Sequence, residues 1–251
     1  MCTLAAFVGV FPAHPLVVAA NRDEYLGRPA LPPRLLRAAA PRAVGGQDLV
    51  AGGTWLGLGE RGLVAGLLNR QSATPPDPSR RSRGQLCLDM LQCETAREAA
   101  ERVAAEPAGR YNAFSLLLAD AREALVAAQP PDEAPRVIPL ESGLHLLTNL
   151  DVNDPTCPRI AASHQGFAVA GAGFTADGDL GAFVARLRSV LADHATALDP
   201  RGPGSLCLHL PAYGTRSSTV LVVPRGDEPF RYFHADGPPC RTPFAPVELW
   251  Q

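Results

Sequence analysis

Residues 2–24 read CTLAAFVGVFPAHPLVVAANRDE, and this stretch indicates the fold more strongly than any other part of the chain. Two apolar, β-rich runs flank a turn at Pro12 to Pro15, which is the pattern of a β-hairpin. The second run ends in four consecutive polar residues, Asn21 to Glu24. Because functional sites often assemble where strands end, we expect these polar side chains to contribute to one.

The rest of the chain alternates between groups of strands and groups of helices. Further hairpin-sized strand patterns are predicted for 54–59, 62–69, 112–120, 123–129, 135–140, 143–150, 205–210, 217–224 and 230–236. Helices are predicted from Arg83 to near Gly109, with Thr95 capping the second of two, and over 180–191. The Pro- and Arg-rich connection from Arg28 to Gly46 is expected to be a long loop that could cover a site.

Strands that come in hairpin-sized groups disfavour a parallel α/β fold and predict antiparallel sheets flanked by helices. The fold class expected is therefore a layered α+β domain. The length of 251 residues suits one large domain or two small ones, and we interpret residues 1–251 as a single domain.

The charge composition excludes several classes of function. All 23 basic residues are arginine, which excludes Schiff-base catalysis, pyridoxal phosphate attachment and the lysine of phosphate-binding loops. The net charge of -2, with interspersed signs, gives no footprint for nucleic acid or an anionic membrane. No signal-type start and no apolar run long enough to cross a bilayer are visible, so we expect a cytoplasmic protein with no integral membrane segment.

The cysteines and histidines show no metal-ligand spacing along the chain. The six cysteines form no C-x-x-C pair, and the six histidines show no pairing at i, i+3 or i+4. No metal site and no disulfide framework are therefore predicted. The pair Cys157-Pro158 could present the Cys157 thiolate as an axial ligand to a bound haem, although we interpret Cys157 as a plain loop cysteine.

Cys2 differs from the other cysteines because removal of Met1 would make it the first residue. A thiol and a free α-amine would then lie on one residue, and an α-amine titrates near 7.7–8.0, so it could take the thiol proton at neutral pH. This is the strategy of N-terminal-nucleophile enzymes.

Five motifs together give the chain a family resemblance. They are MCT at the start, NRDE at 21–24, GGTWLG at 52–57, LLTN at 146–149 and YGTRSST at 213–219. In this order they resemble the NRDE-motif family, known in eukaryotes as the transport and Golgi organisation protein 2 family. The site pattern is also distantly similar to the cysteine N-terminal-nucleophile hydrolases of the choloylglycine and penicillin V acylase group. That resemblance implies a four-layer αββα sandwich.

The same resemblance implies a set of catalytic residues at matching positions: Cys2, Arg22, Asp23, Asn69, Asn149 and Arg216. Asp23 is expected to orient the α-ammonium, and the two arginines to lower the thiol pKa and hold the substrate. The two asparagines would donate to an oxyanion, and turn formation at strand ends is the alternative use for each. The bile-acid loops of choloylglycine hydrolases are not found here, so bile salts are not expected substrates.

These observations predict hydrolysis of an amide or thioester acyl bond of a small molecule, with Cys2 as nucleophile and no cofactor. The alternative is a non-catalytic carrier or chaperone that holds haem or an acyl-CoA-like lipid in the same cleft. The expected partner is thus a small-molecule substrate or a hydrophobic ligand, and the sequence leaves the oligomeric state open.

Overall fold

A computed structural model of the chain describes residues 2–174, 178–194 and 205–251. The chain forms two compact units. The first contains Met1–Arg28 and Ser142–Val247, and the second contains Pro29–Glu141 and Glu248–Gln251.

The first unit is built on a six-stranded antiparallel sheet in the order β10-β1-β2-β11-β12-β13. The strands are β1 (Thr3–Val8), β2 (Leu16–Tyr25), β10 (Gly143–Leu147), β11 (Tyr213–Val223), β12 (Arg231–Ala235) and β13 (Ala245–Pro246). The predicted hairpin is confirmed as β1 and β2, which pair with Thr3 opposite Asn21 and Val8 opposite Leu16. The long strand β11 pairs with the other edge of β2, so the NRDE and YGTRSST motifs lie on adjacent strands.

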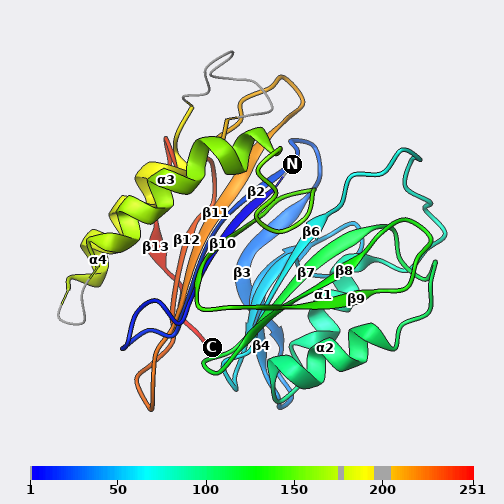
Figure 1. The fold of residues 1–251 in the computed structure, drawn as a ribbon, viewed down its shortest axis with the longest axis horizontal. Helices are drawn as coiled ribbons and strands as arrows, with labels where there is room; N and C mark the ends of the chain where they lie inside the picture. The colour runs from blue at the N-terminus through cyan, green and yellow to red at the C-terminus, as the bar shows by residue number, and fades with distance from the viewer. Residues whose placement is uncertain (1, 175–177, 195–204) are drawn as a thin grey trace. The chain divides into compact units, whose positions relative to one another are not determined.

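Two helices, α3 (Pro158–Ala172) and α4 (Leu180–Leu191), cover one face of this sheet (Figure 1). Alternation along each strand places Ala5 and Phe7 of β1 on that face, in one buried cluster with Phe167 of α3 and Phe183 of α4. Leu4, Ala6 and Val8 of β1 therefore point to the opposite face.

Helix α4 was predicted, and Asp179 caps its first turn by accepting from the Gly181 amide. Helix α3 was missed, because its glycines and scattered polar residues weaken the helical period. Gly171 has a packing reason, since a Cβ there would lie 2.6 Å from the Phe7 ring. Pro158 in the first turn is favourable for the start of a helix, and it is a signal from which α3 could have been predicted.

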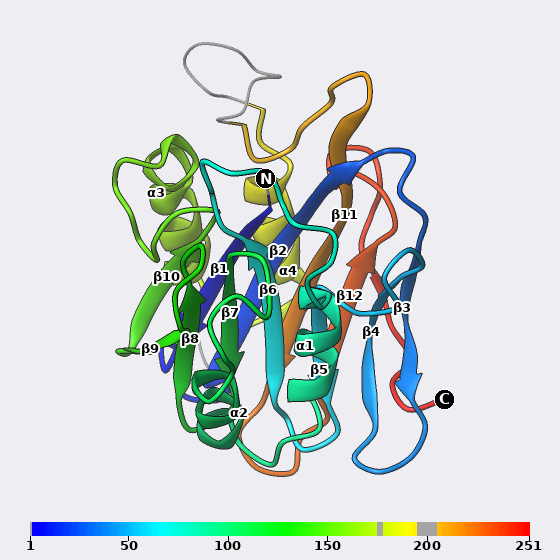
Figure 2. The same ribbon diagram turned by 90° about the vertical axis from the view of Figure 1, so that its right-hand side faces the viewer.

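The second unit is a seven-stranded antiparallel sheet in the order β3-β4-β5-β6-β7-β8-β9, with α1 and α2 on one face (Figure 2). The strands are β3 (Ala30–Arg37), β4 (Ala43–Asp48), β5 (Leu56–Gly59), β6 (Val64–Asn69), β7 (Phe114–Ala119), β8 (Ala124–Gln129) and β9 (Arg136–Leu140). The helices are α1 (Arg83–Met90) and α2 (Ala96–Ala104), and Thr95 caps α2 as predicted by accepting from the Glu98 amide.

Two predictions from the sequence are wrong, one in each unit. The connection from Arg28 to Gly46 is not a loop, because it contains β3 and the start of β4. Pro32 and Pro33 are tolerated since β3 is an edge strand whose register shifts past them. Residues 205–210 are not a strand, and only an isolated bridge joins His209 to Gly214.

The predicted α+β class is confirmed, because each unit consists of a mostly antiparallel sheet with one helical layer. The single-domain interpretation stays a prediction. Among the described residues, no helix combines the length and apolar character needed to cross a bilayer.

Candidate active site

The start of the chain and the end of β2 lie side by side in the first unit. Thr3 is opposite Asn21, so the same antiparallel register continued by one residue puts Cys2 opposite Arg22. Cross-strand partners share a face of the sheet. Cys2 and the buried Arg22 therefore share the face opposite to the one that α3 and α4 cover, whereas Thr3 and Asp23 face the helices.

The thiol of Cys2 is held by the backbone of Asp23. Its Sγ donates to the Asp23 carbonyl oxygen at 3.6 Å, and the hydroxyl of Tyr213 donates to the same oxygen at 3.0 Å. Cys2 is itself half-buried. One carbonyl thus orients the thiol and links the first residue of β11 to the candidate nucleophile.

The carboxylate of Asp23 is bound on both oxygens by buried donors. Arg159 of α3 donates from Nη1 to Oδ2 at 2.6 Å, and Thr215 of β11 donates from Oγ1 to Oδ1 at 2.6 Å. Arg159 Nη1 also donates to the Thr3 hydroxyl at 3.1 Å. This network ties β1, β2, β11 and α3 together at the end of the sheet where Cys2 lies.

Because the ion pair is buried, removing either partner would leave an uncompensated charge. The side chains of Arg159 and Asp23 are both fully inaccessible to solvent, so each charge depends on its partner for compensation. Removing one partner of such a pair typically costs about 3–5 kcal/mol. The network therefore fixes the backbone of Asp23, and through it the position of the Cys2 sulfur.

The charges around Cys2 act in opposite directions on its thiol. Burial raises the pKa of the Cys2 thiol above its ordinary value, and the Asp23 carboxylate raises it further. Arg22 lowers this pKa, as the sequence analysis expected, but does not outweigh burial. Burial likewise raises the pKa of Tyr213, and the nearby Cys2 and Asp23 charges add to it.

Arg216 lies in the first unit, on β11. The pairing of β2 with β11 slips between Thr215 and Ser217, which makes Arg216 the extra residue of a β-bulge. Its guanidinium donates to the carbonyl oxygens of Tyr25 and Leu26, where β2 ends. These bonds brace the strand end from which Asp23 projects.

The two asparagines lie in different units. Asn149 follows β10, the neighbour of β1, and is half-buried in the first unit. Asn69 is the exposed last residue of β6 in the second unit. Both therefore lie at strand ends, as the sequence indicated.

Sequence reasoning missed Arg159, Tyr213 and Thr215. The last two belong to the YGTRSST motif at residues 213–219, so the motif itself was a signal, although we drew only Arg216 from it. Arg159 gave no comparable signal, because its helix was not predicted.

Cys157 lies directly before α3 rather than in an open loop. Its side chain is buried, and its Sγ lies 3.3 Å from the hydroxyl of Thr148. Elsewhere in the first unit, the structure gathers His and Cys side chains that could hold a metal: His194, Cys207, His209 and Cys240. No ligand spacing along the sequence indicates this set, because its residues come from three separate segments.

Comparison with protein families gives a match over most of the chain. The model of the family described as Transport and Golgi organisation 2 matches residues 1–233. A Bos taurus protein described as a Transport and Golgi organization protein 2 homolog is 31% identical over 241 residues, which cover 84% of this chain and 83% of the bovine protein.

Solved structures resemble the chain in fold at low sequence identity. The Caenorhabditis elegans ortholog of N-acylethanolamine-hydrolyzing acid amidase has a TM-score of 0.59 at 14% identity, covering 88% of this chain and 92% of that one. Penicillin V acylase from Agrobacterium tumefaciens has a TM-score of 0.58 at 15% identity, covering 94% and 83%. These likenesses show a fold of the N-terminal-nucleophile hydrolase type.

Proposed function

The chain belongs to the Transport and Golgi organisation 2 family, and on that premise we propose that it is an N-terminal-nucleophile cysteine hydrolase. The bond cleaved is an amide or thioester acyl bond of a small molecule. The observation that carries the proposal is the position of the Cys2 sulfur, 3.6 Å from a carbonyl that belongs to the buried Asp23 network. A sulfur fixed in this way is pre-organised for attack on a bound acyl group.

The proposed reaction begins after Met1 is removed. The α-amine of Cys2, with a pKa of about 7.7–8.0, takes the thiol proton, and the thiolate attacks the acyl carbon to form a C–S bond. Asn149 is proposed to donate to the oxyanion, and such a donor is worth about 2.7–4 kcal/mol. The C–N or C–S bond of the substrate breaks, and the leaving group takes the proton from the α-ammonium. Water then hydrolyses the acyl-cysteine and regenerates the thiol.

Arg22 and Asp23 have different proposed roles. Arg22 shares a face with Cys2 and lowers the thiol pKa, so it stabilises the thiolate. Asp23 acts as a positioning residue, because its carboxylate is engaged by Arg159 and Thr215 while its carbonyl contacts the sulfur. Arg216 braces the end of β2 through the Tyr25 and Leu26 carbonyls.

The test is hydrolysis by a chain that starts at Cys2. Such a chain is released by a site-specific protease from a fusion and assayed against acyl amides of aminocoumarin and acyl thioesters of increasing acyl length. We expect turnover that Cys2→Ala lowers on the order of 10⁴-fold, whereas Cys93→Ala, at a buried cysteine of the second unit, leaves it unchanged. Turnover that is absent, or that Cys2→Ala does not reduce, would overturn the proposal.

The raised pKa of the Cys2 thiol also supports a second candidate function, that of a non-catalytic carrier for haem or an acyl-CoA-like lipid. A thiol that stays protonated is a poor nucleophile. Absorption spectra recorded during haem titration, beside equilibrium binding of a fluorescent acyl-CoA, test this candidate. Saturable binding that Cys2→Ala leaves unchanged, together with absent turnover, would favour the carrier.

A further inference from the structure

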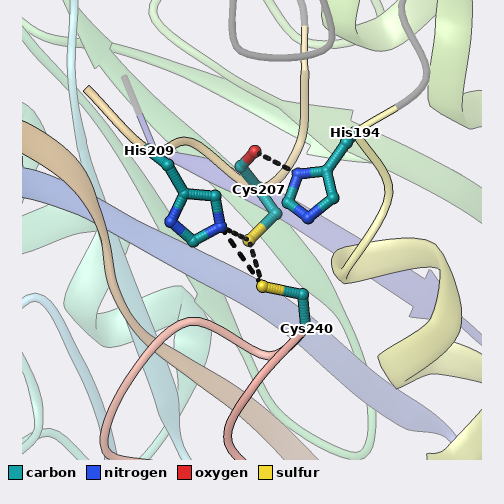
Figure 3. A group of neighbouring side chains, drawn as sticks. All are labelled: His194, Cys207, His209 and Cys240. Atoms are coloured by element: carbon teal, nitrogen blue, oxygen red, sulfur yellow. Dashed lines mark hydrogen bonds between the residues drawn. The ribbon is translucent and has the colours of Figure 1, made fainter.

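Four potential metal ligands meet near the end of the first unit that contains the N-terminal end of β11 (Figure 3). His194 follows α4, Cys207 and His209 precede β11, and Cys240 lies in the connection from β12 to β13. One ligand atom from each residue lies within 4.8 Å of the others. The cluster therefore contains two sulfurs and two imidazole nitrogens as potential ligand atoms.

Three of the donors already have the spacing of a tetrahedral zinc site. Cys207 Sγ lies 3.6 Å from Cys240 Sγ and 3.6 Å from His209 Nε2, and His209 Nε2 lies 3.2 Å from Cys240 Sγ. Zn–S and Zn–N bond lengths of about 2.3 and 2.0–2.1 Å place ligands of a tetrahedron about 3.8 Å apart for two sulfurs and about 3.5 Å apart for sulfur and nitrogen. Each observed separation falls within 0.3 Å of the value expected for that pair.

The fourth residue has the tautomer that a metal ligand needs. His194 Nδ1 lies 3.0 Å from the Cys207 carbonyl oxygen, and because a carbonyl only accepts, Nδ1 carries the proton. The lone pair is therefore on Nε2 and available to a cation. A hydrogen bond from the second ring nitrogen to a backbone carbonyl is the usual way in which metal-bound histidines are oriented.

Hydrogen bonds that do not involve the four ligand side chains hold the three segments together. The Cys207 amide donates to the Asp193 carbonyl at 3.1 Å, which joins the first two segments. Arg188 of α4 donates to the Pro239 carbonyl at 2.9 Å, next to Cys240. Asn21 of β2 donates to the carbonyls of Leu191 and Leu206 at 2.8 and 2.9 Å, which anchors both segments to the sheet. The donor set is thus built into the fold.

We propose that these four residues bind one Zn²⁺ as a structural site: His194, Cys207, His209 and Cys240. Two cysteines and two histidines are a ligand set characteristic of structural zinc, and four protein ligands leave no open position for catalysis. Binding deprotonates the two thiols, the two protons pass to solvent, and the bound Zn²⁺ balances the two thiolate charges.

The composition of the donor set favours a cation over a disulfide between the two cysteines. A divalent cation would supply positive charge beside the two sulfurs and convert both thiols to thiolates. A disulfide between the two cysteines would not need the two imidazoles beside the sulfurs. A disulfide is therefore a weaker interpretation of the cluster than a metal site.

The test measures metal binding by the reduced full-length chain, and it does not depend on hydrolase activity. Elemental analysis after dialysis against zinc is expected to give one equivalent, and Co²⁺ in its place is expected to give the absorption of a tetrahedral site with sulfur ligands. Cys207→Ser, Cys240→Ser and His209→Asn are each expected to abolish the cobalt signal. The matched controls Cys93→Ser, in the second unit, and His164→Asn, exposed on α3, are expected to retain it.

Two results would overturn the proposal. One is a chain that takes up no metal under reducing conditions, including the case in which Cys207 and Cys240 are recovered as a disulfide despite the reductant. The other is uptake that the double variant Cys207→Ser/Cys240→Ser leaves unchanged. Since a variant could fail to fold, the unaltered chain is also heated with and without a chelator, and an unchanged melting temperature after complete zinc removal would contradict a structural role.

Discussion

The Arg159 guanidinium lies 2.6 Å from the Asp23 carboxylate, and neither side chain exposes any surface to solvent. This pair joins α3, which was not predicted from the sequence, to the NRDE motif at residues 21–24. The carbonyl of the same Asp23 contacts the Cys2 sulfur. The stability of the first unit and the geometry of the candidate nucleophile therefore depend on one residue.

Asp23→Asn is expected to lower the free energy of unfolding by about 3–5 kcal/mol, because it leaves the buried charge of Arg159 uncompensated. Urea unfolding measures the loss. Glu94→Gln is the matched control, since its pair with Arg61 is largely exposed and should cost no more than about 1 kcal/mol. Equal losses for the two variants would show that the buried pair contributes no more than a surface pair.

Thr215 connects the Asp23 carboxylate to the segment that carries Cys207 and His209. Its hydroxyl donates to Asp23 at 2.6 Å and accepts from the Leu208 amide at 2.9 Å. Thr215→Val removes both bonds and leaves a buried amide unsatisfied, so we expect a loss of about 1–3 kcal/mol in unfolding free energy. Thr215→Ser retains the hydroxyl and should recover most of this stability; a serine variant as unstable as the valine variant would contradict the role given to the hydroxyl.

The reactivity of Cys2 is expected to depend on Met1. In the chain that retains Met1, burial and Asp23 raise the thiol pKa, so alkylation at neutral pH should be slow and should accelerate only in alkaline solution. In the chain that starts at Cys2, alkylation should rise with an apparent pKa of about 7.7–8.0, that of the α-amine. Iodoacetamide labelling with peptide mapping compares the two chains, and identical pH profiles would remove the α-amine from the mechanism.

His234 is expected to make the folded state sensitive to acid. Burial lowers its pKa from 6.5 to about 4, despite the opposing charge of Asp236, while Nδ1 bonds to the Thr219 hydroxyl at 2.9 Å. Between these two pKa values the unfolded chain binds more protons than the folded one, so stability falls as the pH drops from 6.5 towards 4. The full loss amounts to about 3 kcal/mol.

The His234→Gln variant tests this assignment through urea unfolding measured across that pH range. In this variant, the dependence of the unfolding free energy on pH should lose the contribution of one proton. His164→Gln, at an exposed position of α3, should retain that contribution. A slope that His234→Gln leaves unchanged would assign the acid sensitivity to another group.

The sequence predicted most strands because short, apolar, turn-bounded runs identify them locally. β1 and β2 are apolar runs of this kind, so the hairpin could be predicted from neighbouring residues alone. The same local reasoning failed for β3, where Pro32 and Pro33 indicated a loop. Whether proline fits a strand depends on its place at the sheet edge, and that is a property of the tertiary structure.

The candidate sites divide in the same way. Cys2, Arg22 and Asp23 were predictable, because Cys2 directly precedes β1, the other two lie on the paired strand β2, and all three belong to motifs. Arg159 and Cys240 were not, because each reaches its partners from a distant segment through the packing of α3 or of the β12–β13 connection. Spacing rules detect ligands carried on one element and are insensitive to ligands gathered from three.

The most direct test of the account is the intact mass of the chain after reaction with an activated acyl ester. For the chain that starts at Cys2, we predict one acyl group per molecule, mapped to Cys2 and absent from Cys2→Ala and from the chain that retains Met1. Cys93→Ala should acylate as the unaltered chain does. An unmodified mass for the chain that starts at Cys2, or an acyl group carried by any other cysteine, would contradict the assignment of Cys2 as the nucleophile.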